Sequence, residues 1–309
     1  MKLVFFGSPD FALPTLNALN ESLHDVLGVV TSPDQKSGRG LKIQSTSVKK
    51  MAEKFGIPIF QPVELNDDKF ISTIKQINPD IYLVVAYKIL PESILMIPNQ
   101  GAVNLHASLL PKYRGAAPVH HAILHGESKT GLTTFLLQKK VDTGDLLLQK
   151  IFYIDPSSTT GEALDKLSYI GADLIIETLD GLAKNIIKPK KQNDKSATLA
   201  PKIKIEDCKI DWNNSAKNIH NQIRAFTPTP GAFTLYKDKR IKLFGSKIAK
   251  MVRGIELQPG HINYKAPELL IGTGTKTINI KGIQLEGKKR LLASQFILGF
   301  PEIIGGTFD

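Results

Sequence analysis

Residues 45–86, STSVKKMAEKFGIPIFQPVELNDDKFISTIKQINPDIYLVVA, decide the fold. Two parts of this stretch, 45–55 and 67–77, carry apolar residues at helical spacing, and each is followed by a short apolar run, at 57–60 and at 81–86. Similar runs, expected to be strands, lie at 2–6, 26–30 and 102–106. The alternation of strand and helix predicts an α/β fold with a Rossmann-like, doubly wound and mostly parallel sheet. Ligands of such sheets bind beyond the carboxyl ends of the strands.

The hydrophobic pattern of the sequence changes twice in the remainder of the chain. Apolar segments at 133–137 and 146–153 and a helical pattern from about 160 to 187 complete the α/β part, and a polar stretch broken by Pro189 follows. An amphipathic helix with Ile219, Ile223 and Phe226 on one face then precedes short alternating runs separated by Gly or charged turns. We therefore expect an α/β domain at 1–189, a linker at 190–205 and a small OB-like β-barrel domain at 206–309.

Charge and cysteine content narrow the class of protein. Of the net charge of +11, residues 201–309 carry +9, with 18 Lys and Arg against 9 Asp and Glu, so the first 200 residues carry only +2. A basic surface attracts phosphate-rich partners, and charge alone leaves nucleic acid and anionic membranes as alternatives. The single cysteine, Cys208, excludes an intrachain disulfide framework and a Cys-rich zinc module. The first residues run straight into a predicted strand, with no leader and no 18-residue apolar stretch, so we expect a cytoplasmic protein.

Polar side chains gather at the end of the predicted strand 102–106. Asn104 and His106 are two residues apart, so both side chains point to the same face of the sheet. An isolated Asn-x-His is more often a hydrogen-bonded histidine at a strand end, but here a loop rich in Pro and Gly, SLLPKYRGAAP at 108–118, follows at the ligand-binding end. Asp142, within VDTGD at 141–145, lies in another turn between strands, where an Asx-turn is the alternative interpretation.

An amide, an imidazole and a carboxylate together suit transfer of an acyl group to an amine. Asn104 can donate a hydrogen bond to the oxyanion, and His106 can donate to it or move the proton that the amine loses. Asp142 can orient His106 and favour its charged form. No covalent nucleophile is required, and the residues by themselves indicate acyl transfer without naming the acyl group or its acceptor.

Three other classes of enzyme are less compatible with the sequence. A serine hydrolase would use Ser108 with His106, but Gly-x-Ser-x-Gly is absent. His120, His121 and His125 lack the His-Glu-x-x-His pattern of a zinc site, so a helix is the simpler interpretation and we expect no metal. No Gly-x-Gly-x-x-Gly follows the first strand, which disfavours a nicotinamide enzyme.

The two motifs together resemble the methionyl-tRNA formyltransferase family. The likeness rests on NLHASLLPKYRGAAP at 104–118 and VDTGD at 141–145, and it extends over nearly the whole chain. Further matching stretches are FGSPDF at 6–11, VTSPDQKSGRG at 30–40, APKI at 200–203, IDW at 210–212 and RAFTPTPGAF at 224–233.

This resemblance implies a reaction and a set of site residues. The formyl donor would be 10-formyltetrahydrofolate, the acceptor would be the methionine on initiator tRNA, used in translation initiation, and the catalytic group would be Asn104, His106 and Asp142. Domain 1–189 would then be catalytic. The folate would be bordered by two segments, Ser108, Leu109, Leu110 and Pro111, and Val85, Ala86 and Tyr87. Lys88 stands where the family usually has Gly, which removes easy access to positive φ in this loop.

The basic segments give the expected contacts with tRNA. The cationic stretch QKSGRGLK at 35–42 is a solvated loop tip on composition alone, but the resemblance implies that it reaches the acceptor stem of the tRNA. With the basic domain 206–309, the expected contacts are Lys36, Arg39, Lys42, Lys239, Arg240, Lys242 and Lys247. Formylation of a small amine and a non-enzymatic RNA-binding role are the rival hypotheses, and we expect a monomer.

Overall fold

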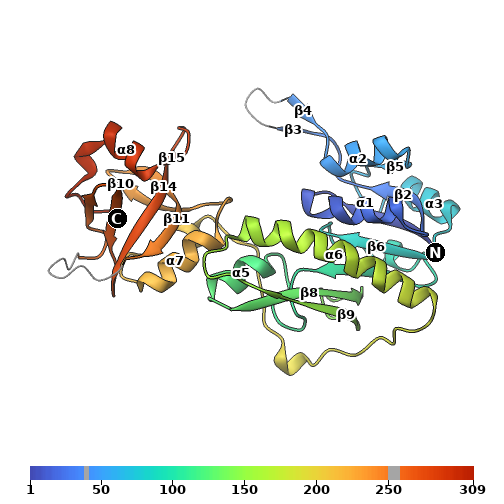
Figure 1. The fold of residues 1–309 in the computed structure, drawn as a ribbon. Coiled ribbons are helices and arrows are strands. Elements are labelled where there is room, and N and C mark those ends of the chain that lie inside the picture. Colours follow the sequence, from blue (N-terminus) through green and yellow to red (C-terminus); the bar gives the residue numbers. More distant parts are fainter. Residues whose placement is uncertain (38–41, 250–257) are drawn as a thin grey trace. The chain divides into compact units, whose positions relative to one another are not determined.

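The computed structural model describes residues 1–37, 42–249 and 258–309 and forms two compact units (Figure 1). The first unit comprises Met1–Pro118, Thr130–Tyr153 and Leu164–Ala200. The second comprises Val119–Lys129, Ile154–Ala163 and Pro201–Asp309. Because two short segments from the first half of the chain fold with the C-terminal part, the units interleave along the sequence. The division at 1–189, 190–205 and 206–309 stays a prediction.

The first unit is built on a seven-stranded sheet. Its strand order is β5-β2-β1-β6-β7-β8-β9. The strands are β1 (Lys2–Gly7), β2 (Asp25–Val30), β5 (Ile59–Phe60), β6 (Ile81–Val85), β7 (Ala102–His106), β8 (Lys129–Leu136) and β9 (Leu146–Tyr153). The pairs from β5 to β7 are parallel, and β8 runs antiparallel to β7. The predicted mostly parallel, Rossmann-like sheet is confirmed.

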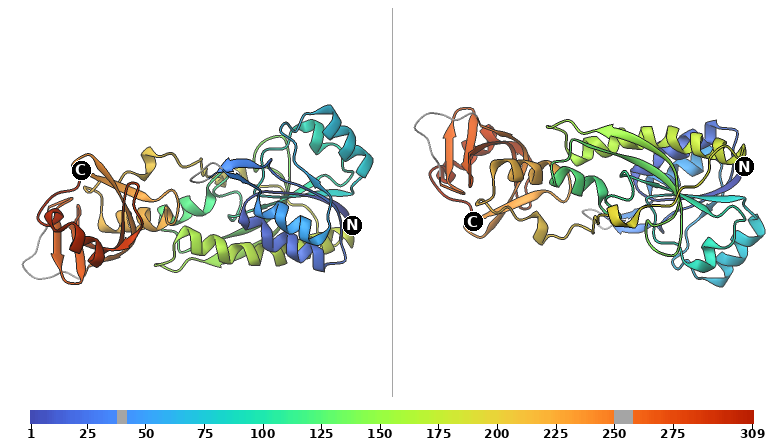
Figure 2. Two further views of the ribbon diagram at one scale, coloured as in Figure 1. Left: turned by 90° about the horizontal axis from the view of Figure 1, so that it is seen from above. Right: turned by 90° about the horizontal axis from the view of Figure 1, so that it is seen from below.

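Helices cover both faces of this sheet, with α1 and α6 on one face and α3 and α4 on the other (Figure 2). Their sequences contain the stop and start signals of helices: the side chain of Thr46 caps α2, that of Asp67 caps α3, and Gly56 ends α2 in the left-handed conformation. The helices of this unit are α1 (Leu13–Glu21), α2 (Ser47–Phe55), α3 (Asp68–Ile77), α4 (Glu92–Leu95) and most of α6 (Thr160–Ala183). Apart from Pro118, α5 (Pro118–Leu124) belongs to the second unit. In the described ranges, no helix is long and apolar enough to cross a membrane.

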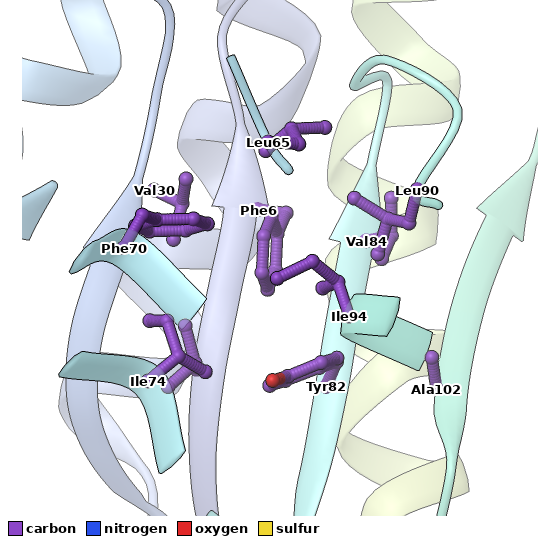
Figure 3. Close-up of a cluster of buried hydrophobic side chains, with 11 residues drawn as sticks. Phe6, Val30, Leu65, Phe70, Ile74, Tyr82, Val84, Leu90, Ile94 and Ala102 are labelled. Atoms are coloured by element: carbon purple, nitrogen blue, oxygen red, sulfur yellow. The ribbon is translucent and has the colours of Figure 1, made fainter. Parts of the chain in front are cut away.

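A hydrophobic cluster fixes β1 and β6 beneath α3 and α4 (Figure 3). Phe6 from β1 meets Tyr82 from β6 edge to face, with ring centroids 4.9 Å apart, and Phe70 and Ile94 pack from the helices. The order of the sheet reverses at β1, which pairs with β2 on one side and β6 on the other. The carboxyl ends of β1, β6 and β7 therefore form the edge at which ligands of such sheets bind.

The second unit contains an all-antiparallel sheet in the order β10-β11-β14-β13-β12, with β15 paired to β14. Its elements are α7 (Ala216–Ala225), β10 (Ala232–Tyr236), β11 (Lys239–Ile248), β12 (Ile262–Lys265), β13 (Glu268–Gly272), β14 (Thr277–Leu285), β15 (Leu291–Leu292) and α8 (Ala293–Gly299). Trp212 donates to the hydroxyl of Thr234 at 3.0 Å and stacks on Phe308, which anchors the end of the chain in the core. The predicted small C-terminal β fold is confirmed.

Candidate active site

Strand β7 presents Asn104 and His106 on one face of the sheet. Asn104 lies opposite Val84 of β6 and Phe135 of β8, and His106 lies opposite Thr133. The side chain of Asn104 is half-buried and has no hydrogen-bond partner among the described residues, whereas His106 is only 6% exposed. The amide of Asn104 is therefore available to a ligand, as its predicted role requires.

The imidazole of His106 is held by its neighbours in one orientation. Its Nε2 lies 2.8 Å from the carbonyl oxygen of Tyr113. Because a carbonyl oxygen only accepts, Nε2 must be the donor. Nδ1 lies 3.7 Å from Oδ2 of Asp142, and the ring meets Phe135 edge to face. Nδ1 is thus the ring atom that is left to exchange a proton with Asp142 or with a substrate.

Asp142 lies in the turn between β8 and β9 and is itself buried, with 8% of its surface exposed. Its backbone is in the left-handed region, at φ 53°. Oδ2 accepts a hydrogen bond of 2.8 Å from the backbone N–H of Gly115, which is 27 residues away in sequence. The carboxylate therefore serves the loop that follows β7 rather than its own turn, which disfavours the Asx-turn interpretation.

Both the backbone conformation and the available space require glycine at position 115. Its φ is 124°, and a Cβ atom there would lie 2.6 Å from the carbonyl oxygen of Ala200. The adjacent backbone pairs with the segment 190–200: Tyr113 N–H donates to Oγ1 of Thr198 at 2.8 Å, and Arg114 N–H donates to its carbonyl at 2.9 Å. The loop after β7 is thus fixed by a segment that comes about eighty residues later.

The loop predicted to border the folate is tied to β8. Ser108 is fully buried, its hydroxyl donates to the carbonyl of Lys112 at 2.6 Å, and its own carbonyl accepts from the hydroxyl of Thr133 at 2.6 Å. A buried hydroxyl with this partner is not placed as a nucleophile, which disfavours the serine-hydrolase hypothesis. Leu110 is buried, and Leu109 and Pro111 are half-buried.

The other predicted folate-bordering segment follows β6. Val85 is buried and pairs with Leu105, while Ala86 is exposed and adopts φ 49°. The hydroxyl of Tyr87 is buried without a hydrogen-bond partner among the described residues, and burial raises the pKa of this group to about 12. Lys88 is exposed and does not adopt positive φ. The left-handed residue of this loop is Ala86, so the replacement of Gly by Lys88 leaves the backbone unstrained.

The four expected tRNA contacts in the second unit all lie on β11, but they differ in their surroundings. Lys239 and Lys247 are exposed. The guanidinium of Arg240 lies over the ring of Phe233, 4.4 Å from its centroid. Nζ of Lys242 donates to the carbonyl of Pro230 at 2.7 Å. This lysine therefore binds the loop before β10, a contact that the sequence did not indicate.

The basic stretch 35–42 of the first unit is a hairpin in its described part. Lys36 lies on β3 (Gln35–Ser37) and Lys42 on β4 (Lys42–Gln44), and the two strands pair antiparallel. Arg39 lies outside the described residues. No cluster of three or more His, Cys, Asp or Glu that could hold a metal ion occurs within 1–37, 42–249 and 258–309.

Sequence reasoning missed the polar residues that hold these loops. Gln149 on β9 donates from Nε2 to Leu110 O and to Oγ1 of Thr133, both at 2.9 Å. Gln192 donates from Nε2 to Asp142 O at 3.0 Å and to Gly144 O at 2.7 Å. Gln192 lies in a polar segment without periodicity, so no local signal could have identified it.

Comparisons with known proteins place this geometry in a class. The family profile described as formyl transferase matches residues 1–179, and that of the formyl transferase C-terminal domain matches residues 202–301. A sugar 3N-formyl transferase, WlaRD, solved in the presence of dTDP and 5-N-formyl-THF, shares the fold, with a TM-score of 0.70 at 20% identity over 94% of this chain and 99% of the other. The chain is therefore an enzyme of the formyl transferase class.

Relatives with higher sequence identity show which family of formyl transferases the chain belongs to. A methionyl-tRNA formyltransferase from Thermodesulfovibrio yellowstonii is 45% identical over 298 residues, which cover 96% of this chain and 95% of that protein. The structure of a methionyl-tRNA formyltransferase from Clostridium thermocellum matches with a TM-score of 0.55 at 19% identity, over 82% of this chain and 95% of the other. This chain belongs to the methionyl-tRNA formyltransferase family.

Proposed function

We propose that this enzyme transfers the formyl group of 10-formyltetrahydrofolate to the free α-amino group of methionyl initiator tRNA. The observation that carries the proposal is the group formed by Asn104, His106 and Asp142 at the carboxyl edge of the sheet. It consists of an amide with no hydrogen-bond partner among the described residues and an imidazole whose Nδ1 lies 3.7 Å from a buried carboxylate. The identity with methionyl-tRNA formyltransferases along the whole chain supports this acceptor.

The chemistry follows from where charge and protons must go. The amine nitrogen attacks the formyl carbon, the carbonyl oxygen becomes an oxyanion, and the bond to N10 of the folate then breaks. Asn104 donates to the oxyanion, a contribution worth about 10²–10³ in rate for one such donor. Nδ1 of His106 and the carboxylate of Asp142 take the proton from the amine and return a proton to N10, so the enzyme stays unmodified.

The donor is assigned to the loops at the ends of β6 and β7. Ser108 to Pro111 and Val85 to Tyr87 border the folate in this proposal, and backbone groups at the exposed Ala86 turn supply hydrogen bonds. The hydroxyl of Tyr87 and the amide of Asn104, neither of which has a hydrogen-bond partner in the part of the chain that the structure describes, fit a polar heterocyclic ligand at this edge.

The acceptor is assigned to the basic parts of both units. In the second unit Lys239, Arg240, Lys242 and Lys247 of β11 contact tRNA phosphates, and in the first unit the basic stretch 35–42, with Lys36, Arg39 and Lys42, positions the acceptor end. In this proposal residues 1–189 are catalytic, 190–205 connect and 206–309 bind tRNA. The enzyme acts in the cytoplasm as a monomer, without a metal ion.

The test is incubation of the enzyme with 10-formyltetrahydrofolate and one acceptor at a time. The acceptors are methionyl initiator tRNA, methionyl elongator tRNA and a nucleotide-linked amino sugar. We expect formylation of the methionyl initiator tRNA, with much slower reaction of the other two. Formylation of the amino sugar alone would instead identify a small-amine formyltransferase, and tRNA binding without any formylation would identify an RNA-binding protein.

A further inference from the structure

Gln192 closes a ring of hydrogen bonds around the turn that carries Asp142. Its Nε2 donates to the carbonyl oxygens of Asp142 at 3.0 Å and Gly144 at 2.7 Å, on the two sides of the turn. Its Oε1 accepts from Nε and Nη2 of Arg114, at 3.2 Å and 2.7 Å. Arg114 precedes Gly115, whose N–H binds the carboxylate of Asp142. Both the backbone and the carboxylate of Asp142 are thus held by hydrogen bonds.

Arg114 is itself held firmly enough to orient Gln192. The guanidinium is buried, and Nη2 also donates to Oδ1 of Asp194 at 2.7 Å. This hydrogen bond and the charge of Arg114 hold the pKa of the Asp194 carboxyl below its usual value. Because Nε and Nη2 of Arg114 can only donate, Gln192 must turn its Oε1 toward the arginine, and its NH₂ group then points to the turn.

The turn has a backbone conformation that benefits from such support. Asp142 has φ 53°, in the left-handed region that residues other than Gly adopt infrequently, although Asp tolerates it better than most. Gly144 has no space for a side chain, since a Cβ atom there would collide with the carbonyl oxygen of Leu136. Two hydrogen bonds from the Gln192 amide hold the carbonyls of residues 142 and 144, and the N–H of Gly115 binds Oδ2, which lies 3.7 Å from His106 Nδ1.

We propose that Gln192 is a positioning residue for formyl transfer, which sets the distance between Asp142 and His106 without touching either substrate. The proposal rests on the catalytic role assigned above to Asp142. Gln192 lies in a polar segment outside the sheet, and the same segment also binds the loop of His106 through Thr198 and Tyr113. One short stretch, 190–200, therefore orients both proton-transferring side chains.

The test is the single-turnover rate of formylation at saturating donor and methionyl initiator tRNA. For Gln192→Ala we expect a rate about 10–100-fold lower, as for other supporting residues of catalytic sites, with the affinities for both substrates within about threefold of wild type. Gln192→Glu keeps the acceptor for Arg114 but puts an oxygen that cannot donate against the two carbonyls of the turn, so we expect at least the same loss of rate.

Gln222 provides a matched control in the second unit. Its Nε2 also donates to two backbone carbonyls, those of Asp207 and Lys209, both at 3.0 Å. Gln222→Ala therefore removes two amide-to-carbonyl hydrogen bonds like those that Gln192 makes to the turn, without the two that Gln192 accepts from Arg114. We expect its single-turnover rate to equal that of wild type within about twofold.

A double-mutant cycle with Asp142→Asn separates positioning from general loss of structure. If Gln192 acts through Asp142, Gln192→Ala should change the rate less than about threefold in the Asp142→Asn background. An equal loss in both backgrounds, or a wild-type rate for Gln192→Ala or Gln192→Glu, would overturn the proposal. A wild-type rate for Asp142→Asn alone would instead reject the catalytic group itself, so the two failures are distinguishable.

Discussion

The active-site edge of the first unit and the basic strand β11 of the second unit are organised in opposite ways. At the edge, His106 and Asp142 are almost fully buried, and each is held by a defined hydrogen bond. On β11, Lys239 and Lys247 are exposed, and no described side chain pairs with either. In the proposed function, the chemistry thus depends on a few interdependent groups, whereas the affinity for tRNA is distributed over many independent charges. Single substitutions should therefore be severe in one region and mild in the other.

The largest effect on the rate of formylation is expected from a substitution of Asn104, whose side-chain amide has no hydrogen-bond partner among the described residues. Asn104→Ala removes the proposed oxyanion donor, and we predict a fall in kcat of about 10²–10³-fold with little change in affinity for tRNA. The side chain is half-buried and makes no other hydrogen bond in the described structure, so the thermal midpoint should change little. Steady-state kinetics test this, with the exposed Asn99→Ala as the control. A loss confined to KM would make Asn104 a binding residue.

A somewhat smaller loss of rate is expected from a substitution of Gly115, which supports the site through its backbone N–H. In Gly115→Ala the new methyl group meets the carbonyl of Ala200 at 2.6 Å, and the backbone at φ 124° is strained by about 1–3 kcal/mol. We predict a rate at least about tenfold lower, since this N–H orients Asp142. The same substitution at Gly299, where nothing lies near the added Cβ, should leave the rate unchanged. Equal rates for both variants would break the link between Gly115 and catalysis.

The sequence predicted the framework of the site well, because its signals are local. The predicted strand 102–106 coincides with β7, and the run 146–153 coincides with β9. Buried parallel strands read as short apolar runs, and the two-residue period of a strand then places Asn104 and His106 on one face.

The supporting residues could not be predicted, for physical reasons. Gln192 binds a carbonyl that lies 50 residues earlier in the sequence. It belongs to a polar stretch, and the sequence of a polar stretch does not show whether it packs against a domain or stays in solvent. The hairpin formed by β3 and β4 has a polar sequence, so it resembled a loop. The interleaving of the two units depends on contacts of α5 and 154–163 that no local pattern encodes. The sequence could not show which residue of the loop after β6 takes positive φ; it is Ala86 and not Lys88.

The distributed charges should produce a moderate effect that depends on salt. Removing Lys239 and Lys247 together should reduce the slope of log affinity for tRNA against log salt by about 0.7–0.9 for each phosphate that is no longer neutralised. The rate at saturating tRNA should be unchanged. Lys184→Ala, which removes an exposed charge from the first unit, is the control. An unchanged slope would count against β11 as a tRNA-binding strand.

The smallest effect is a pH dependence of the second unit. Burial lowers the pKa of His220, whose Nε2 donates to Pro156 O at 3.2 Å while Nδ1 accepts from the hydroxyl of Ser246 at 2.9 Å. The unfolded chain binds a proton more readily, so this contribution to stability is complete above a pH of about 6.5 and is lost as the pH falls from there. Thermal midpoints from about pH 7.5 to 5.5 should therefore decrease less for His220→Gln than for wild type. Parallel decreases would show that another group titrates.

The most direct test of the central claim is Asp142→Asn, which keeps the size of the side chain and removes its charge. Single-turnover formylation of methionyl initiator tRNA and the Kd for that tRNA should be measured on the same preparation. We predict a rate at least about 100-fold lower with Kd within about twofold of wild type, because Asp142 acts on the proton of His106 and not on the RNA. A rate within about threefold of wild type would contradict the assignment of Asn104, His106 and Asp142 as the group that transfers the formyl unit.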